Sequence, residues 1–427
     1  MVRALGHASC FGAVVNVGKI LGPGFVTGAS DDDPSGIGTY AVAGATLGLQ
    51  TLWTALLTFP LMASVQNICA RVGMVSGQGL AGVLRDNYPR PLLYGAVALL
   101  FVANTINVGA DLGAIADAVH TVIGVKAVWL VVPVAAGIVA LQIFGSYRLI
   151  ARVFKWLTLA LLAYVVDAFI VHPDLSETLR ATVVPTLSLD PAYITTIVAI
   201  LGTTISPYLF FWQSTEVVEE ERAEGRTTVA ERRGASDAEL RSATVDTVVG
   251  MGFSNLVMYF IILATALTLF KAGKTDIKSA ADAAEALKPL AGDFAGLLFA
   301  IGMIGAGLLA VPILSGSAAY AIAEAFGWRY GLDHKWNRAK EVYGVIIVAT
   351  ALGTALNFLE IDPIDALYWT AVINGIAAPP LLVLLMLAAR NERVMREQRI
   401  GPVLTTLGWL ATGGMFLSLI AFALTRG

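Results

Sequence analysis

Apolar stretches of about 20 residues, the length a helix needs to cross a bilayer, recur along almost the whole chain. They are separated by short segments that are charged or rich in Gly and Pro. The 427 residues are 57% hydrophobic and 14% charged, which is too apolar for a soluble globular protein. The sequence therefore predicts an all-α, polytopic membrane protein with about eleven transmembrane helices.

Two charged segments do not fit this pattern of spans. Residues 276–290 are too short and too charged to cross a bilayer, so we expect a surface helix there. Residues 219–241 form the main soluble loop. The predicted spans are residues 20–46, 49–75, 91–119, 127–145, 147–171, 193–218, 241–270, 292–325, 340–357, 366–389 and 402–425.

The distribution of Lys and Arg indicates the orientation. If the N-terminus is cytoplasmic, 21 of the 28 basic residues fall on the inner side of these spans. Basic residues accumulate in cytoplasmic loops, and this bias sets membrane topology. We therefore expect a protein of the cell (inner) membrane with a cytoplasmic N-terminus and an external C-terminus.

Three consecutive aspartates, Asp31, Asp32 and Asp33, lie inside the first span, and Pro34 follows them. A carboxylate at membrane depth costs roughly 2.5–3.5 kcal/mol on insertion scales, so three together need a cation, water or polar partners. Proline interrupts the helix, which a membrane tolerates only where the freed backbone lines a cavity or is buried in protein. These features together predict a cation site.

The sixth span carries a second interruption, from Gly202 to Pro207. Spans one and six each begin a block of five, and interruptions at corresponding positions mark the binding site of inverted-repeat transporters. We expect a LeuT-like five-plus-five inverted repeat with broken helices 1 and 6. The chain is one transporter domain, with repeats at about 18–171 and 190–390 and an additional helix at 402–425.

Helix capping is a simpler reading of both interruptions. Asp33-Pro34 and Ser206-Pro207 each match an N-cap residue followed by proline at the first helical position. Capping does not exclude ligation, and it does not explain why the first site needs three acids. We expect Asp33 to bind the cation. Asp31 and Asp32 face an aqueous vestibule, bind other polar groups, or ligate the ion directly.

At these interruptions the chain resembles the Nramp family of divalent-metal transporters, in the runs GPGFVTGASDDDPSGIGTY and GTTISPYLFFWQS. The resemblance implies that Asp33, Gly36, Thr203 and Ser206 occupy the metal-site positions, where the family has Asp, Asn, Ala and Met. Losing the Met thioether leaves hard oxygen ligands, and a wider oxygen site suits partly hydrated Mg²⁺. The pattern resembles the Nramp-related magnesium transporter branch and implies transport of Mg²⁺ and also Mn²⁺.

The resemblance also bears on protons. The family's proton route uses an acid three positions after the third-span Asp, which is Asp111 here, and histidines in span six. Those positions hold Ala114, Tyr208 and Gln213. Because proton relays require titratable side chains, this implies uptake that is not coupled to protons. The alternative is a proton-coupled Mn²⁺/Fe²⁺ transporter.

Several other polar residues are candidates for the permeation path. Asn104, Asn107 and Asp111 share one face of span three; the asparagines suit hydrogen bonds between helices, while Asp111 lines the path or is paired in the interior. Asn374 is a candidate for ion hydration. Thr204 lies within the second interruption and Tyr208 directly follows it, and both are candidates too. Two acidic clusters either attract cations or are solvated surface charge: Glu216, Glu219, Glu220 and Glu221, and Glu360, Asp362 and Asp365.

Other functions fit less well. The chain has no HExxH, GxSxG, P-loop or dinucleotide-binding motif, so we expect no enzyme and no cofactor. Na⁺-coupled uptake of an organic solute would share the broken-helix scaffold, but the three acids would repel an anionic substrate. We expect a monomer whose partners are divalent metal ions and the lipid bilayer, with no nucleic acid.

Overall fold

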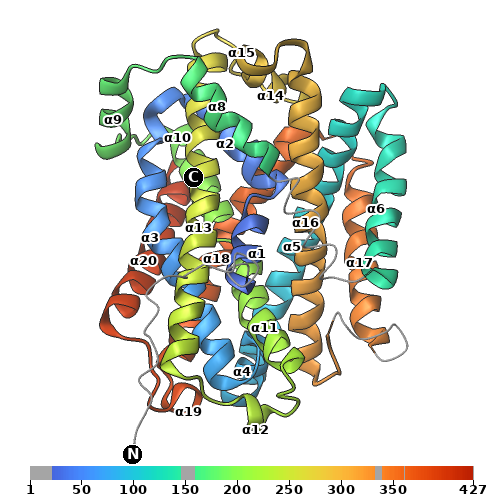
Figure 1. Cartoon of the computed structure of the whole chain (residues 1–427), viewed down its shortest axis with the longest axis vertical. Helices are drawn as coiled ribbons and strands as arrows, with labels where there is room; N and C mark the ends of the chain where they lie inside the picture. The colour runs from blue at the N-terminus through green and yellow to red at the C-terminus, as the bar shows by residue number, and fades with distance from the viewer. Residues whose placement is uncertain (1–21, 146–158, 332–338, 360, 427) are drawn as a thin grey trace, which may run out of the picture.

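The computed structural model describes residues 22–145, 159–331, 339–359 and 361–426. All regular elements in these ranges are helices, and they form an elongated bundle (Figure 1). The predicted N-terminal segment, the first half of the predicted fifth span, and Glu360 lie outside the described residues.

The first part of the chain supplies the first broken helix and the long helices α3 and α5. Its elements are α1 (Pro23–Asp31), α2 (Pro34–Leu47), η2 (Gly48–Thr51), α3 (Trp53–Ser76), α4 (Leu80–Asn87), α5 (Arg90–Ile123), α6 (Ala127–Phe144), η3 (Leu159–Leu162), α8 (Ala163–Ile170) and α9 (Leu175–Val183).

The second part supplies the second broken helix, the four long helices α13, α16, α18 and α20, and the shorter α17. Its elements are α10 (Pro191–Thr204), α11 (Pro207–Ala223), α12 (Val229–Arg232), α13 (Asp237–Thr265), η4 (Ala266–Phe270), α14 (Ala280–Ala284), η5 (Glu285–Leu287), α15 (Lys288–Ala291), η6 (Gly292–Phe294), α16 (Ala295–Phe326), α17 (Lys340–Leu356), α18 (Pro363–Arg390), α19 (Glu392–Met395) and α20 (Pro402–Arg426).

Eight helical segments of the described chain are long and apolar enough to cross a membrane. Three predicted spans take other forms. The first is divided into α1 and α2, the fifth is described only from η3 onward, and the ninth is the 17-residue α17. Residues 276–290, expected as one surface helix, form the short helices α14, η5 and most of α15.

The predicted soluble loop, residues 219–241, is largely helical. Helix α11 continues to Ala223 and α13 begins at Asp237, so the charged residues lie mainly on helix ends. Capping boxes begin α12 and α13, because Thr228 and Ser236 each bind the backbone three residues on. Such boxes satisfy N–H groups that a helix start leaves without partners.

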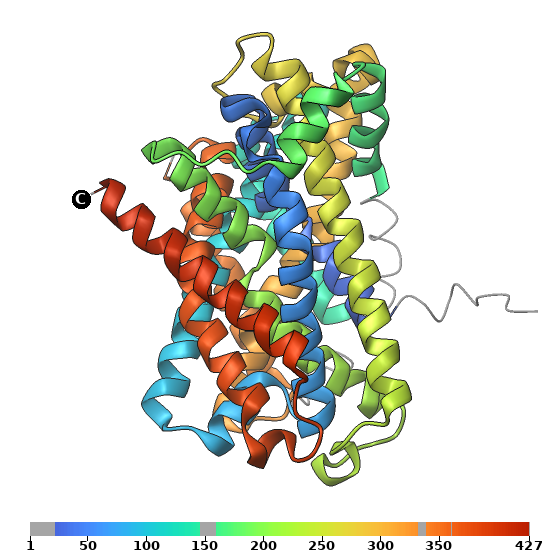
Figure 2. The same cartoon turned by 90° about the vertical axis from the view of Figure 1, so that its left-hand side faces the viewer.

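The two ends of the bundle carry different short helices. We call the end with α9, α14 and α15 the upper end, and the end with α4, α12 and α19 the lower end (Figure 1). Helices α6 and α20 lie on the outside; only 22% of the residues in the most apolar part of each are buried. Figure 2 shows α20 crossing the bundle obliquely. Such large exposed apolar faces fit contact with lipid.

Glycines allow very close helix crossings beside both breaks. Helix α1 packs against α13, where a Cβ added at Gly28 would lie 2.2 Å from the carbonyl carbon of Gly250. Helix α10 packs against α18, where a Cβ at Gly202 would lie 2.3 Å from the backbone nitrogen of Gly375. Small residues let backbones approach this closely in membrane helices. Each broken helix is thus held tightly by an unbroken one.

Candidate functional site

The first break forms where the sequence predicts it. Helix α1 ends at Asp31 and α2 begins at Pro34, with Asp33 as its N-cap. One Asp33 oxygen, Oδ1, accepts hydrogen bonds from the Gly36 backbone N–H at 2.7 Å and the Ser35 hydroxyl at 2.8 Å. The predicted cap is therefore confirmed, and it uses only one of the two carboxylate oxygens.

The second break also lies at the predicted position, but its cap differs. Helix α10 ends at Thr204 and α11 begins at Pro207. Ser206 stands at the N-cap position, yet its hydroxyl points back and donates to the carbonyls of Gly202 at 2.9 Å and Thr203 at 2.7 Å. The expectation that the Ser206 side chain caps α11 is therefore wrong. The hydroxyl instead satisfies carbonyls that the end of α10 leaves without helical partners.

The second oxygen of Asp33 binds a polar chain that leads to α5 and α18. Asn107 Nδ2 lies 2.9 Å from Asp33 Oδ2 and 3.3 Å from Asp111 Oδ2. Asn374 Nδ2 in turn donates to Asn107 Oδ1 at 3.2 Å. All four residues are at most 1% exposed. We call Asp33, Asn107, Asp111 and Asn374 the Asp33 group.

The other two acids lie against a different helix. The Ser254 hydroxyl, on α13, is 2.7 Å from Asp31 Oδ2 and 3.1 Å from Asp32 Oδ1. Both aspartates are fully buried, so they do not line an open vestibule in this conformation. The alternative that they bind other polar groups is confirmed for this contact. We call Asp31, Asp32 and Ser254 the Ser254 group.

The remaining predicted site residues, near the two breaks, make different contacts. A Cβ added at Gly36 would lie 3.1 Å from Thr203 Oγ1, so these two positions face each other. The Thr204 hydroxyl bonds to a carbonyl of its own helix and is not drawn to the acids. Tyr208 donates to the Ser30 carbonyl at 2.8 Å and thereby ties α11 to the end of α1.

No basic side chain neutralises these acids within the part of the chain that the structure describes. Its ion pairs lie at the two ends of the bundle, and none includes Asp31, Asp32 or Asp33. Burying unpaired carboxylates is costly, so such groups bind a cation or take up protons. The centre of the bundle is therefore built to attract positive charge.

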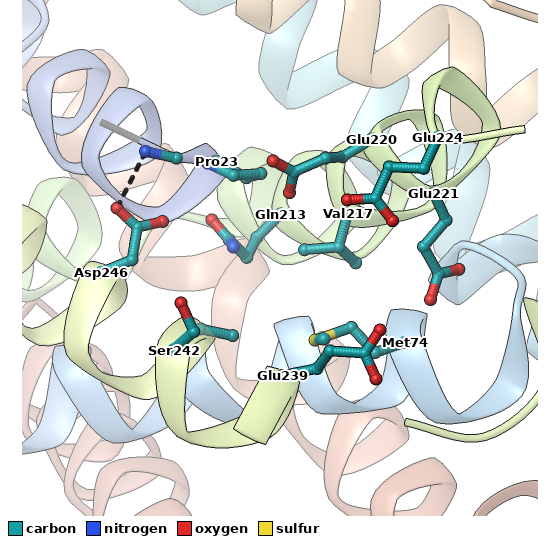
Figure 3. Close-up of a pocket in the computed structure, with 12 residues that line it drawn as sticks. Pro23, Met74, Gln213, Val217, Glu220, Glu221, Glu224, Glu239, Ser242 and Asp246 are labelled. Carbon is teal, nitrogen blue, oxygen red and sulfur yellow. Dashed lines mark hydrogen bonds between the residues drawn. The ribbon is translucent and has the colours of Figure 1, made fainter. Parts of the chain in front are cut away.

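A cavity of about 180 Å³ lies between α1, α3, α11 and α13 toward the lower end. Figure 3 shows Gln213 and several carboxylates around it. Among the four Glu that were expected to attract cations or be solvated, Glu221 is buried, with one oxygen 3.3 Å from Arg226, while Glu220 is exposed. For Glu221, the solvated-surface alternative is wrong.

Asp246 of α13 binds the start of α1 at the edge of the same cavity. Its carboxylate accepts hydrogen bonds from the N–H groups of Gly22, Gly24 and Phe25, at 2.6 to 3.2 Å. A carboxylate at a helix N-terminus is favourable because it satisfies free N–H groups and faces the positive end of the helix dipole. Asp246 thus caps α1 from a neighbouring helix.

Two of these residues, Ser254 and Asp246, were not recognised as parts of the site from the sequence. Asn107 was a candidate, since it precedes Asp111 by four residues and so shares its helix face. The interpretation as hydrogen bonding between helices holds for Asn107, which contacts Asp33 and Asn374, and for Asn104, which donates to Leu314 O on α16. Ser254 and Asp246 had no local signal, because their partners are more than 220 residues away in the chain.

The chain is similar to known proteins over nearly its whole length. The family model for natural resistance-associated macrophage protein-like (Nramp) proteins matches residues 24–425. The chain is 26% identical over 396 residues to the divalent metal cation transporter MntH of Deinococcus radiodurans, covering 91% of this chain and 86% of that protein. It is 26% identical over 401 residues to MntH of Aeromonas hydrophila, covering 92% of each.

Solved structures agree on the fold. The Eremococcus coleocola manganese transporter, crystallised with an aromatic bis-isothiourea compound, superposes with a TM-score of 0.77 at 16% identity, covering 97% of this chain and 88% of that one. MhsT with L-phenylalanine gives 0.63 at 13% identity, covering 96% and 99%. These likenesses confirm the predicted all-helical, LeuT-like fold.

The curated relatives are transporters, as expected for a chain that is not an enzyme. With its family model matched from residue 24 to residue 425, the chain belongs to the Nramp family.

Proposed function

We propose that this protein transports divalent cations across the cell membrane, Mg²⁺ and also Mn²⁺, through a central site at Asp33. The observation that carries the proposal is the position of Asp33. Its carboxylate lies fully buried between two broken helices, and within the described ranges its hydrogen-bond donors are all neutral. The names of the relatives, which are divalent metal and manganese transporters, support the class of substrate.

The preference for Mg²⁺ rests on the chemistry of the ligands. Ser206 and Gly36 stand where the family motif has Met and Asn, so the break offers oxygen atoms and no thioether. Mg²⁺ takes oxygen ligands and gives up its waters reluctantly, whereas sulfur ligands favour softer transition metals. Asn107 and Asn374 add amide groups at the same depth. They suit contact with an ion that keeps part of its hydration shell.

We also propose that transport is not coupled to protons. Tyr208 and Gln213 replace the histidines of the family pattern, and both are engaged with α1: Tyr208 with the Ser30 carbonyl, Gln213 with the Thr27 hydroxyl. Neither side chain exchanges a proton near neutral pH. With Mg²⁺ the expected driving forces are the cation gradient and the membrane potential.

The experiment is uptake of Mg²⁺ and Mn²⁺ into proteoliposomes, with internal pH recorded at the same time. We expect Asp33→Asn, which keeps a capping side chain, to abolish uptake of both ions. Asp117→Asn is a matched control, because Asp117 is also buried on a membrane helix, but among the described residues its side chain binds only the Ala280 N–H at the upper end. Unchanged uptake in Asp33→Asn would refute the site. Acidification that depends on the metal would instead favour the proton-coupled Mn²⁺/Fe²⁺ alternative.

We also propose which end of the bundle faces the cytoplasm. The positive-inside rule assigns the Arg-rich segments around α4, α12 and α19 to the cytoplasm, and these helices share the lower end (Figure 1). The lower end would then face the cytoplasm, and the transported ion would leave the protein there. The monomeric state and the limits of the two repeats stay predictions.

A further inference from the structure

In the Ser254 group, one hydroxyl lies close to an oxygen of each of two carboxylates but has only one hydrogen to donate. Ser254 Oγ lies within 3.1 Å of an oxygen of both Asp31 and Asp32. A hydroxyl has one hydrogen to donate, so it serves one carboxylate well and meets the other oxygen largely without a proton between them. A cation, or a second proton on one of the carboxyl groups, is needed to hold these three oxygen atoms together.

The outer oxygens of the pair strengthen this need. Asp31 Oδ1 and Asp32 Oδ2 are buried, and neither has a hydrogen-bond partner among the described residues. Both side chains are 0% exposed, so bulk water does not satisfy them in this conformation. Buried polar atoms are nearly always paired, and an unpaired one calls for a specific explanation such as an ion.

The pair is separate from the Asp33 group. Asp33 binds Ser35, Gly36 and Asn107 toward α5, whereas Asp31 and Asp32 bind α13. Within the described residues, no three acidic, His or Cys side chains converge as a single metal site. The three consecutive aspartates therefore serve two places rather than one.

We propose that Asp31, Asp32 and Ser254 form a second divalent-cation site, which takes the same hard cations as the Asp33 site. Two carboxylates match the charge of one divalent ion, and carboxylate and hydroxyl oxygens suit Mg²⁺ or Mn²⁺. This proposal rests on the proposed function, because it assumes that divalent cations reach the centre of the bundle.

The lower cavity provides a direction for exchange. Thr27 lies one turn before Asp31 on α1, and its hydroxyl hydrogen-bonds to Gln213, which lines the cavity. Pro23, a further turn down α1, lines the same cavity (Figure 3). The Thr27–Gln213 hydrogen bond therefore lies along α1 between the Ser254 group and the acidic cavity. An ion in the second site would lie on the lower side of Asp33, next to this route.

The test counts Mn²⁺ bound to the full-length protein in nanodiscs, by electron paramagnetic resonance of free Mn²⁺ at saturation. We expect two ions per chain in the native protein. Asp33→Asn should retain one, and the double variant Asp31→Asn/Asp32→Asn, which keeps side-chain shape, should also retain one. Asp117→Asn should retain two.

Two results would overturn the second site: one ion in the native protein and none in Asp33→Asn, or two ions in the double variant. Either result leaves the proposed function standing. Two ions in Asp33→Asn would instead refute the proposed central site.

Ser254 gives a check that does not depend on removing charge. Ser254→Ala should weaken the second binding event about 10–100-fold, as loss of a supporting ligand contact does, and leave the first unchanged. Ser254→Thr retains the hydroxyl and should bind as the native protein does. Equal weakening of both events by Ser254→Ala would show a structural role only and contradict the proposal.

Discussion

Asn107 is the side chain that connects Asp33 to the rest of the centre. It donates to the carboxylates of Asp33 and Asp111 and accepts from Asn374, so three helices meet at one amide. Hydrogen bonds to charged groups contribute about 1.5–3 kcal/mol. The orientation of Asp33 Oδ2, the oxygen that the cap leaves free, therefore depends on Asn107.

We expect Asn107→Ala to weaken Mg²⁺ binding about 10–100-fold, the range seen when a residue that orients a metal ligand is lost. Calorimetric titration of the purified protein with Mg²⁺ and Mn²⁺ measures this change. Asn104→Ala is the matched control, because Asn104 lies one turn away on α5 and donates to Leu314 O instead. Equal affinity in the two variants would show that Asn107 does not orient Asp33.

Single residues were predictable from the sequence where the rule is local. Asp33 was recognised as an N-cap because the cap, the proline and the bound N–H are within four residues. Ser206 matched the same pattern, yet its hydroxyl bonds backward to α10, because the carbonyls freed by the break compete for it. Ser254 could not be predicted, since only the folded bundle brings it to Asp31.

The approximate lengths of the helices were predictable from the sequence, but which helices pack against each other was not. The spans follow from apolar length, whereas the crossing of α1 and α13 depends on which glycines face each other. A Cβ at Gly250 would lie 2.3 Å from the Gly24 carbonyl oxygen. Nothing in the spacing of Gly24 and Gly28 on α1 indicates that α13 is the partner. The same holds for Asp246, which caps α1 from that partner.

We expect Gly250→Ala to destabilise the protein by about 1–3 kcal/mol, the usual cost of overpacking, because backbone atoms of α1 cannot move aside cheaply. Gly252→Ala is the control on the same helix, where a new Cβ would meet only the Phe59 ring at 3.4 Å. That change should be neutral or slightly stabilising, since alanine favours a helix over glycine. Thermal unfolding in detergent compares the two. A lower midpoint for Gly252→Ala than for Gly250→Ala would contradict the crossing.

The whole molecule is closed on both sides of Asp33, which is only 1% exposed. Toward the lower end, α11 contacts α16: Ser317 donates to the Tyr208 carbonyl at 2.8 Å, and the Thr215 hydroxyl lies 3.2 Å from Glu324. Toward the upper end, α10 packs on α18 through glycines. The lower contact is made by polar side chains and the upper contact by the backbone of glycines. A substitution can therefore disrupt one contact without the other.

The upper closure has a direct test at Gly375. A Cβ there would lie 2.5 Å from the Val198 carbonyl oxygen, so Gly375→Leu should hold α18 away from α10. The reporter is Ser206→Cys, in a chain whose two native cysteines are replaced by alanine. We expect Gly375→Leu to raise its reaction with an impermeant thiol reagent several-fold from the upper side only. In the chain with native Ser206, the same change should abolish uptake, because alternating access requires both closures to form in turn.

The control for Gly375→Leu is Gly344→Leu on α17, where no atom of another described helix lies within 4 Å of the new Cβ. It should change neither the reactivity nor the uptake. If Gly375→Leu increased labelling from the lower side, the α10–α18 contact would not be the upper closure. If it left labelling and uptake unchanged, the glycine contact would be packing alone. Because α16 and α11 are untouched in this variant, the lower closure should stay shut, and the two sides of Asp33 would be shown to open independently.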